Sequence, residues 1–259
     1  MSERFFVEQP IEGDQAILVG AEAHHLCHVL RARRGEFVTL FDGTGCEYRA
    51  RIEAIARAHV SLSVLDKSLV DRELPFSLTL GVSLPRGDRQ KWMVEKLSEL
   101  GATRLVPLLA QRTVAEPGAA ARERLRRAAI EAAKQCGRNR LLEIDEPVQL
   151  ADFLAAASPA GQRWFLHPQT PPDDDTCGAE SPSMPHSPIP SPGTAVVIAV
   201  GPEGGFTDEE FQESLTRGWS PRSLGPRILR IETAAIAITA QLAGSGYMPR
   251  IAARAVHPG

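Results

Sequence analysis

The sequence is poor in cysteine and aromatic residues and has no long apolar run. Aromatic residues make up 5% of the 259 positions, and no segment of about 18 or more apolar residues occurs, so a membrane-spanning helix is not expected. The first residues lack a basic head followed by an apolar stretch, which argues against secretion. The four cysteines form no CxxC pair, so neither a disulfide scaffold nor a cysteine zinc site is expected; they are Cys27, Cys46, Cys136 and Cys177. We expect a cytoplasmic protein of one or two domains.

Charge is unevenly distributed, although the formal net charge is only −3. Residues 86–140 contain thirteen Lys or Arg against six Asp or Glu, whereas residues 141–259 contain seven against fourteen. Clustered cations gain affinity for a polyanion by releasing phosphate counterions. The basic segment therefore indicates either a nucleic-acid surface or an ordinary solvated helix face.

The first 70 residues have the pattern of a small β domain. An Asp42-Gly43 hairpin signal lies among three strand-like segments, residues 36–41, 48–52 and 60–65. A short helix is expected between Ala21 and Leu30, with Leu26, Val29 and Leu30 on its apolar side. Closely spaced short strands favour a small barrel. The polar segment ending at Pro75 favours a domain boundary, which we place between residues 71 and 72.

After Pro75 the pattern changes to alternating strands and helices. Strands are predicted at residues 78–84, 104–109, 164–166 and 195–200, and helices at about 89–100 and 121–136. Gly101 and Gly137 terminate the two helices. The last of these strands is apolar throughout, as expected of a strand covered on both faces. This order predicts an α/β fold with a parallel sheet and helices on its faces.

A proline-rich segment, residues 168–194, interrupts the alternation. It contains eight of the twenty prolines, many serines and three consecutive aspartates. Such a composition cannot bury enough apolar surface to offset its ordering entropy, so we predict a flexible surface loop. The loop could be a tolerated insertion or a functional lid.

A glycine-rich turn follows the last apolar strand directly. Gly201-Pro202-Glu203-Gly204-Gly205 allows close approach of backbone to a ligand, at the carboxyl end of a strand where α/β proteins bind ligands. Residues 207–210 form a capping box that opens a helix. The turn is neither a Walker A loop nor a GxGxxG fingerprint, which disfavours a phosphate-cradling NTPase or a classical dinucleotide site. A nucleotide-dependent oxidoreductase is disfavoured because no glycine fingerprint opens the first βα unit after Pro75. As a bare motif it could equally be a tight strand-to-helix turn.

A second segment makes the pattern specific. Residues 224–235 read LGPRILRIETAA, in which a Gly-Pro turn and two arginines precede an alanine-rich helix running to about Ala243. Helix capping alone would explain Glu232 and Thr233. Together with the GPEGG turn, however, the segment resembles the SPOUT methyltransferases. Among them it is similar to the family of ribosomal RNA small subunit methyltransferases that methylate N3 of a uridine in 16S rRNA.

The resemblance extends over nearly the whole chain. Residues 4–7 and 24–31 resemble the family's amino-terminal PUA-like, RNA-binding barrel, and residues 96–101, Arg112 and residues 131–140 resemble its central helices. Residues 166–168 match the first cofactor loop, although the proline-rich segment after them is longer than the family's usual link.

The resemblance implies a fold, a cofactor and a partner. The fold would be a trefoil-knotted parallel sheet (residues 72–259) behind a PUA-like barrel (residues 1–71), an exception to the rule that chains do not thread loops. S-adenosylmethionine would bind between three loops, the substrate would be 16S rRNA of the small ribosomal subunit, and the protein would be a homodimer. The implied cofactor-binding residues are Leu166, His167, Pro168, Gly201, Pro202, Glu203, Gly204, Gly205, Leu224, Gly225, Arg227, Ile228, Leu229 and Thr233.

Two residues are candidates for catalysis. Arg230 could stabilise the anionic uracil that develops during transfer, with Glu232 orienting it or relaying the proton. The pair could instead pin the knot loop. RNA contacts are expected from His25, Arg31, Arg33, Arg34, Arg86, Arg138 and Arg140, mainly to phosphates, although each could be a solvated surface charge.

Other functions remain to be weighed. No metal site is expected, because His24, His25 and His28 near Cys27 lack a carboxylate or further histidine to complete a ligand set. The rival hypotheses are a 2′-O-ribose methyltransferase of the same superfamily and a non-catalytic RNA-binding or ribosome-assembly protein.

Overall fold

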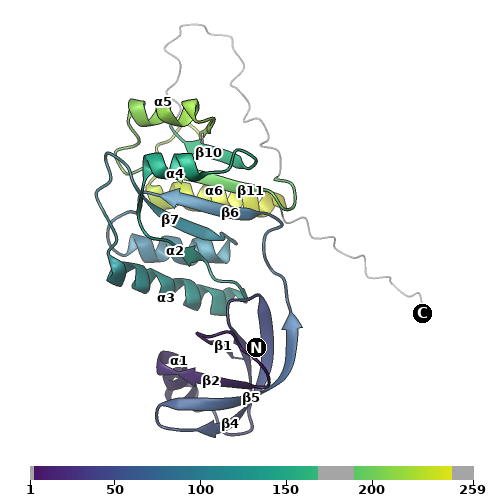
Figure 1. Cartoon of the computed structure of the whole chain (residues 1–259). Coiled ribbons are helices and arrows are strands. Elements are labelled where there is room, and N and C mark those ends of the chain that lie inside the picture. Colours follow the sequence, from purple (N-terminus) through teal and green to yellow (C-terminus); the bar gives the residue numbers. More distant parts are fainter. Residues whose placement is uncertain (1–2, 169–189, 247–259) are drawn as a thin grey trace, which may run out of the picture.

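The chain folds around two β-sheets (Figure 1). The computed structural model describes residues 3–168 and 190–246. Most of the predicted proline-rich loop, residues 169–189, lies outside the described residues, and so does Cys177. None of the helices in the described ranges is both long enough and apolar enough to cross a membrane.

The amino-terminal sheet has five strands in the order β1-β3-β4-β5-β2. All of its pairings are antiparallel except the parallel pairing of β1 with β3. The predicted hairpin is confirmed, since the chain turns through residues 42–45 between β3 and β4. Alternate residues such as Leu18, Leu40 and Ile52 face a buried core. The strands are β1 (Arg4–Phe6), β2 (Gln15–Val19), β3 (Phe37–Phe41), β4 (Cys46–Ile55) and β5 (His59–Leu69).

The short helix expected after residue 20 has two parts. An α-helical turn, α1 (Gly20–His24), runs into a π-helical turn, η1 (His25–Val29). Leu26 is fully buried and Leu30 packs against the core, but Val29 is 62% exposed, so its predicted place on the apolar side is wrong. Val29 is the last residue of the π-helical turn, whose i→i+5 hydrogen bonding departs from the period of 3.6 residues on which the prediction rests.

The second sheet is parallel throughout, as predicted. Its strand order is β12-β10-β11-β6-β7-β8, and β9 also pairs with β7. The chain therefore leaves β6 toward β7 and later returns on the other side of β6. The strands are β6 (Ser77–Val82), β7 (Arg104–Leu109), β8 (Glu143–Ile144), β9 (Val148–Gln149), β10 (Gln162–Leu166), β11 (Ala195–Val200) and β12 (Ser220–Arg222).

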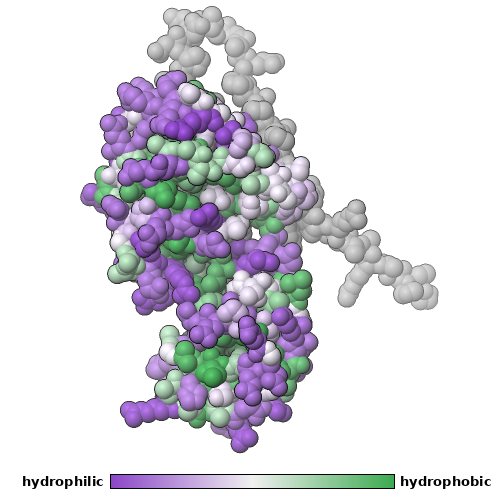
Figure 2. Space-filling view, viewed as in Figure 1, coloured by the Kyte–Doolittle hydropathy of each residue, from purple (hydrophilic) through white to green (hydrophobic). Residues whose placement is uncertain are grey.

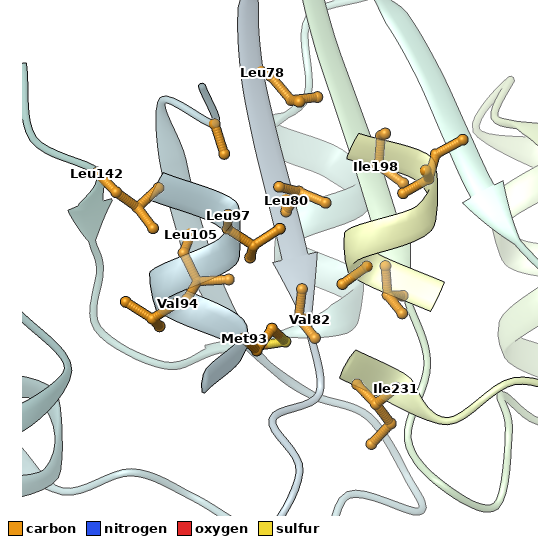
Figure 3. Close-up of a cluster of buried hydrophobic side chains, with 14 of the residues drawn as sticks. Leu78, Leu80, Val82, Met93, Val94, Leu97, Leu105, Leu142, Ile198 and Ile231 are labelled. Atoms are coloured by element: carbon orange, nitrogen blue, oxygen red, sulfur yellow. The ribbon is translucent and has the colours of Figure 1, made fainter. Parts of the chain in front are cut away.

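Helices cover both faces of this sheet. One core contains side chains of α2, α3 and α6, and the other contains side chains of α4 and α5. Figure 3 shows Leu80 and Val82 of β6 beside Met93 and Leu97 of α2, with Ile231 of α6 nearby. The helices are α2 (Arg89–Glu99), α3 (Ala119–Cys136), α4 (Leu150–Ala156), α5 (Asp208–Thr216) and α6 (Ile231–Gly246).

The connection between the sheets is held by a buried arginine. The connection runs between Leu69, the end of β5, and Ser77, the start of β6. It contains the domain boundary predicted between residues 71 and 72, which stays a prediction. Arg138, just after α3, pairs with Glu73 and donates to the carbonyl oxygens of Ser98 and Ala102 at 2.7 and 3.1 Å. Arg138 is 3% exposed. Its predicted RNA contact is therefore wrong, because a guanidinium enclosed by protein acceptors cannot reach a phosphate.

A second group of polar contacts holds the small sheet against the end of α3. Arg4 donates to Glu47 and to the side-chain oxygen of Asn139, both at 2.7 Å. Arg72 donates to the carbonyl oxygen of Gly137, also at 2.7 Å. These contacts fix the small sheet relative to the parallel sheet.

Replacing Arg138 should destabilise the protein strongly. We expect Arg138→Ala to lower the free energy of unfolding by about 3–5 kcal/mol, because it leaves Glu73 and two carbonyl groups without their buried partner. Urea unfolding measures the change. Arg124→Ala on the exposed face of α3 is the control and should change stability by less than about 0.5 kcal/mol. Equal stability of the two variants would contradict the structural role of Arg138.

Candidate active site

A cavity of about 260 Å³ lies at the carboxyl ends of β10, β11 and β12. Because the three strands are neighbours and parallel, the turns that follow them meet at one edge of the sheet. Three segments and the first turns of α6 line the cavity: residues 166–168, residues 200–206 and residues 222–229 without Pro226, together with Ile231 and Ala234. Its walls therefore combine apolar side chains with glycine-rich backbone.

The structure brings together almost every residue implied as cofactor-binding. Of those fourteen, all except Thr233 line the cavity. Thr233 lies in the first turn of α6 with its side chain exposed. The sequence resemblance thus predicted a set of residues that are contiguous in space, although they come from three separate connections.

The GPEGG turn is shaped by its glycines. Gly205 has a φ of +71°, which a residue with a side chain rarely adopts, and its amide donates to the carbonyl oxygen of Pro202 at 2.9 Å. A Cβ atom on Gly201 would lie 2.9 Å from the ring of Phe206, which is buried against Phe165. The capping box predicted after the turn is confirmed, with Thr207 as the amino-terminal cap of α5.

Two arginines that the sequence analysis did not assign to the cofactor site contact this turn from other elements. Arg112, after β7, donates to the carbonyl oxygen of Gly204 at 2.7 Å. Arg89, the first residue of α2, donates to the carboxylate of Glu203 at 2.7 Å. This hydrogen bond, together with the charge of Glu232, raises the pKa of Arg89. Neither contact could be predicted from residue spacing within a motif, because the partners lie 92 and 114 positions apart in the sequence.

The two candidate catalytic residues lie in different surroundings. Arg230 is exposed, between Leu229 and Ile231, which both line the cavity. Glu232 is 4% exposed, and its Oε1 lies 3.5 Å from a guanidinium nitrogen of Arg89. Among the described residues no ion pair joins Glu232 to Arg230. Glu232 therefore does not orient Arg230 through a direct ion pair here; its cationic partner is Arg89.

The other predicted RNA-contacting residues, apart from Arg138, lie at the surface. Arg31, Arg33 and Arg34 are exposed just before β3 of the five-stranded sheet. Arg86, before α2, and Arg140, after α3, are exposed in the part that contains the parallel sheet. His25 is half-buried, with its ring edge-on to Phe5. Nine of the thirteen cations of residues 86–140 make ion pairs, so much of that positive surplus is locally compensated.

A second, larger cavity is a poor candidate for the active site. It has a volume of about 1120 Å³ and lies between the small sheet and α3, where Figure 2 shows the surface hollowed between the two parts. Its charged lining is mostly acidic, with Glu8, Glu12 and Glu22 from the small domain. None of its lining residues comes from the carboxyl ends of β10, β11 and β12, where the glycine-rich turns meet. In the described ranges no three His, Cys, Asp or Glu residues are grouped to hold a metal ion.

Two protein-family models match the chain. The RNA methyltransferase domain matches residues 72–243, and the RNA methyltransferase PUA domain matches residues 18–65. The chain belongs to the RNA methyltransferase family. The SPOUT-type α/β fold and the PUA-like sheet predicted for such an RNA methyltransferase are confirmed.

Relatives of this RNA methyltransferase are similar over most of their length. The ribosomal RNA small subunit methyltransferase E of Synechocystis sp. is 34% identical over 235 residues, covering 91% of this chain and 74% of the relative. The structure of a ribosomal RNA small subunit methyltransferase E of Neisseria gonorrhoeae, bound to S-adenosylmethionine, is 29% identical with a TM-score of 0.77, covering 93% and 96%. A Legionella pneumophila protein in complex with the same cofactor is 30% identical with a TM-score of 0.80, covering 95% and 98%.

Proposed function

We propose that this chain transfers the methyl group of S-adenosylmethionine to N3 of a specific uridine in 16S rRNA of the small ribosomal subunit. The observation that carries the proposal is the single cavity enclosed by the three turns after β10, β11 and β12. Two relatives with this fold are bound to S-adenosylmethionine, and one of them bears a small-subunit rRNA methyltransferase name. We expect the activity in the cytoplasm, where ribosomal subunits are assembled.

The residues of the cavity fit this cofactor. Leu166, Leu224 and Leu229 supply apolar walls for an adenine ring, and the glycine turns expose N–H and C=O groups that can read its edge. A side chain on Gly225 would meet no other atom within 4 Å, so open space borders that turn. Glu203 contributes a carboxylate to the lining, which suits a ligand with a positive charge. When bound, the cofactor supplies an electrophilic methyl group on its sulfonium.

Arg230 is the proposed catalytic cation. The uracil must lose its N3 proton before or during transfer, because a neutral imide nitrogen is a poor nucleophile. Arg230 is exposed, and its chain neighbours Leu229 and Ile231 line the cavity, which supports the proposal that its guanidinium stabilises the developing negative charge. Since N3 lies on the Watson–Crick edge, the base must be unpaired or flipped out before transfer.

The product analysis and an Arg230 variant together test the function. We expect purified protein to place one methyl group on N3 of a uridine in small subunits from a strain that lacks the enzyme, as measured by mass spectrometry of nucleosides. Arg230→Ala should reduce turnover about 100- to 1000-fold and leave cofactor affinity unchanged. Arg217→Ala, at the exposed end of α5, is the control. A 2′-O-methyl product would identify the rival enzyme, and cofactor binding without any product would favour a non-catalytic protein.

The exposed arginines of the small domain are proposed to contact RNA phosphates. Replacing Arg31, Arg33 and Arg34 together by Gln should weaken RNA binding and reduce the slope of log affinity against log salt by about two. Filter binding over a range of salt concentrations measures this slope. An unchanged slope would remove these residues from the RNA-binding surface.

The protein is proposed to act as a homodimer. Ile228 is 85% exposed in the third turn of the cavity, where a second chain could cover it. Sedimentation velocity should give twice the chain mass of 28.1 kDa, and Ile228→Asp should shift the protein toward monomer. A monomeric wild-type protein at micromolar concentration would contradict this expectation.

A further inference from the structure

Arg89 contacts two parts of the site that come from different connections. One guanidinium nitrogen donates to Glu203, in the turn after β11, at 2.7 Å. The other lies 3.5 Å from Glu232, in the first turn of α6. Glu203 lines the cavity, and Glu232 is bracketed in sequence by Ile231 and Ala234, which line it too. A single side chain from α2 thus holds the second cofactor turn and the beginning of α6 in one arrangement.

The buried partner makes this contact more demanding than a surface ion pair. The side chain of Glu232 is only 6% exposed, and its Oε2 has no hydrogen-bond partner among the described residues. In the same ranges Arg89 is the one cation within ion-pair distance of it. Without Arg89, Glu232 would be a buried carboxylate with no compensating charge, which is costly unless the carboxylate is protonated or the helix end moves.

We propose that Arg89 is a positioning residue for the methyl-donor site: through Glu203 and Glu232 it fixes the second cofactor turn relative to the first turn of α6. The inference rests on the proposed function and extends it to a residue outside the cavity. Arg89 itself is not among the residues that line the cavity. Its effect should appear in cofactor affinity and in the order of the two segments, with no direct effect on RNA binding.

The geometry also predicts which replacement is tolerated. A guanidinium can direct separate N–H groups at two carboxylates at once, whereas a lysine ammonium is a single point charge on a flexible stem. Arg89→Lys should therefore keep a positive charge beside Glu232 but hold Glu203 and Glu232 together less firmly than the arginine does. Lys91→Ala is a matched control, because Lys91 lies on the same helix, is 58% exposed and makes a weaker ion pair with Glu95 at 3.7 Å.

The test combines calorimetry of S-adenosylmethionine binding with hydrogen–deuterium exchange of the unliganded, full-length protein. We expect Arg89→Ala to weaken cofactor binding about tenfold, Arg89→Lys to weaken it less, and Lys91→Ala to match the wild type. Amides of residues 201–206 and 231–235 should exchange faster in Arg89→Ala only. RNA affinity should be unchanged in all three variants, and the cofactor KM should rise more than kcat falls.

Glu203→Gln provides an independent variant if Arg89→Ala fails to fold. It removes the charge of Glu203, which weakens the contact between Arg89 and the turn, and it leaves the pairing of Arg89 with Glu232. It should therefore give a smaller loss of cofactor affinity and faster exchange only around residues 201–206. Wild-type affinity and exchange in both Arg89→Ala and Glu203→Gln would overturn the positioning role. A wild-type protein that binds no S-adenosylmethionine would overturn the proposed function, and the exchange data would still decide whether Arg89 orders the two segments.

Discussion

The site depends on the burial of β10 and β11 between two hydrophobic layers. Trp164 and Leu166 face the core shared with α6, while Phe165 between them faces the core shared with α4 and α5. Because neither face of these strands is open, a ligand can approach the sheet only at the strand ends. Parallel pairing then places the carboxyl ends of β10, β11 and β12 at one edge, where three turns enclose one cavity.

The charges around this cavity come from elements that are distant in the sequence. Arg89 and Arg112 precede the GPEGG turn by about a hundred residues, yet they hold its side chain and its backbone respectively. Glu232 likewise pairs with Arg89 of α2, and among the described residues no ion pair joins it to Arg230, two positions earlier in the chain. Arg230 is exposed at the surface, whereas Glu232 is buried beside Arg89.

The basic segment shows how a charge count differs from a charged surface. Arg138 is enclosed by Glu73 and two carbonyl groups, and Arg126 pairs with Glu8 of the small domain. Both count toward the surplus in residues 86–140, but both connect parts of the protein. The exposed arginines at residues 31, 33 and 34 come from a segment with a negative balance overall, which a count over long windows obscures.

The sequence by itself determined the alternation of strands and helices after residue 75, the hairpin at residue 42 and the glycine turn with its capping box, because hydrophobic period, turn residues and caps are local. It missed β1, β2, α4 and the short strands β8, β9 and β12, whose few residues carry too little pattern. Only the tertiary structure decided that β11 lies between β10 and β6, that Arg138 is internal and that Glu232 pairs with Arg89. Those outcomes depend on which distant elements share a core, and neither a local period nor a spacing of residues encodes that choice.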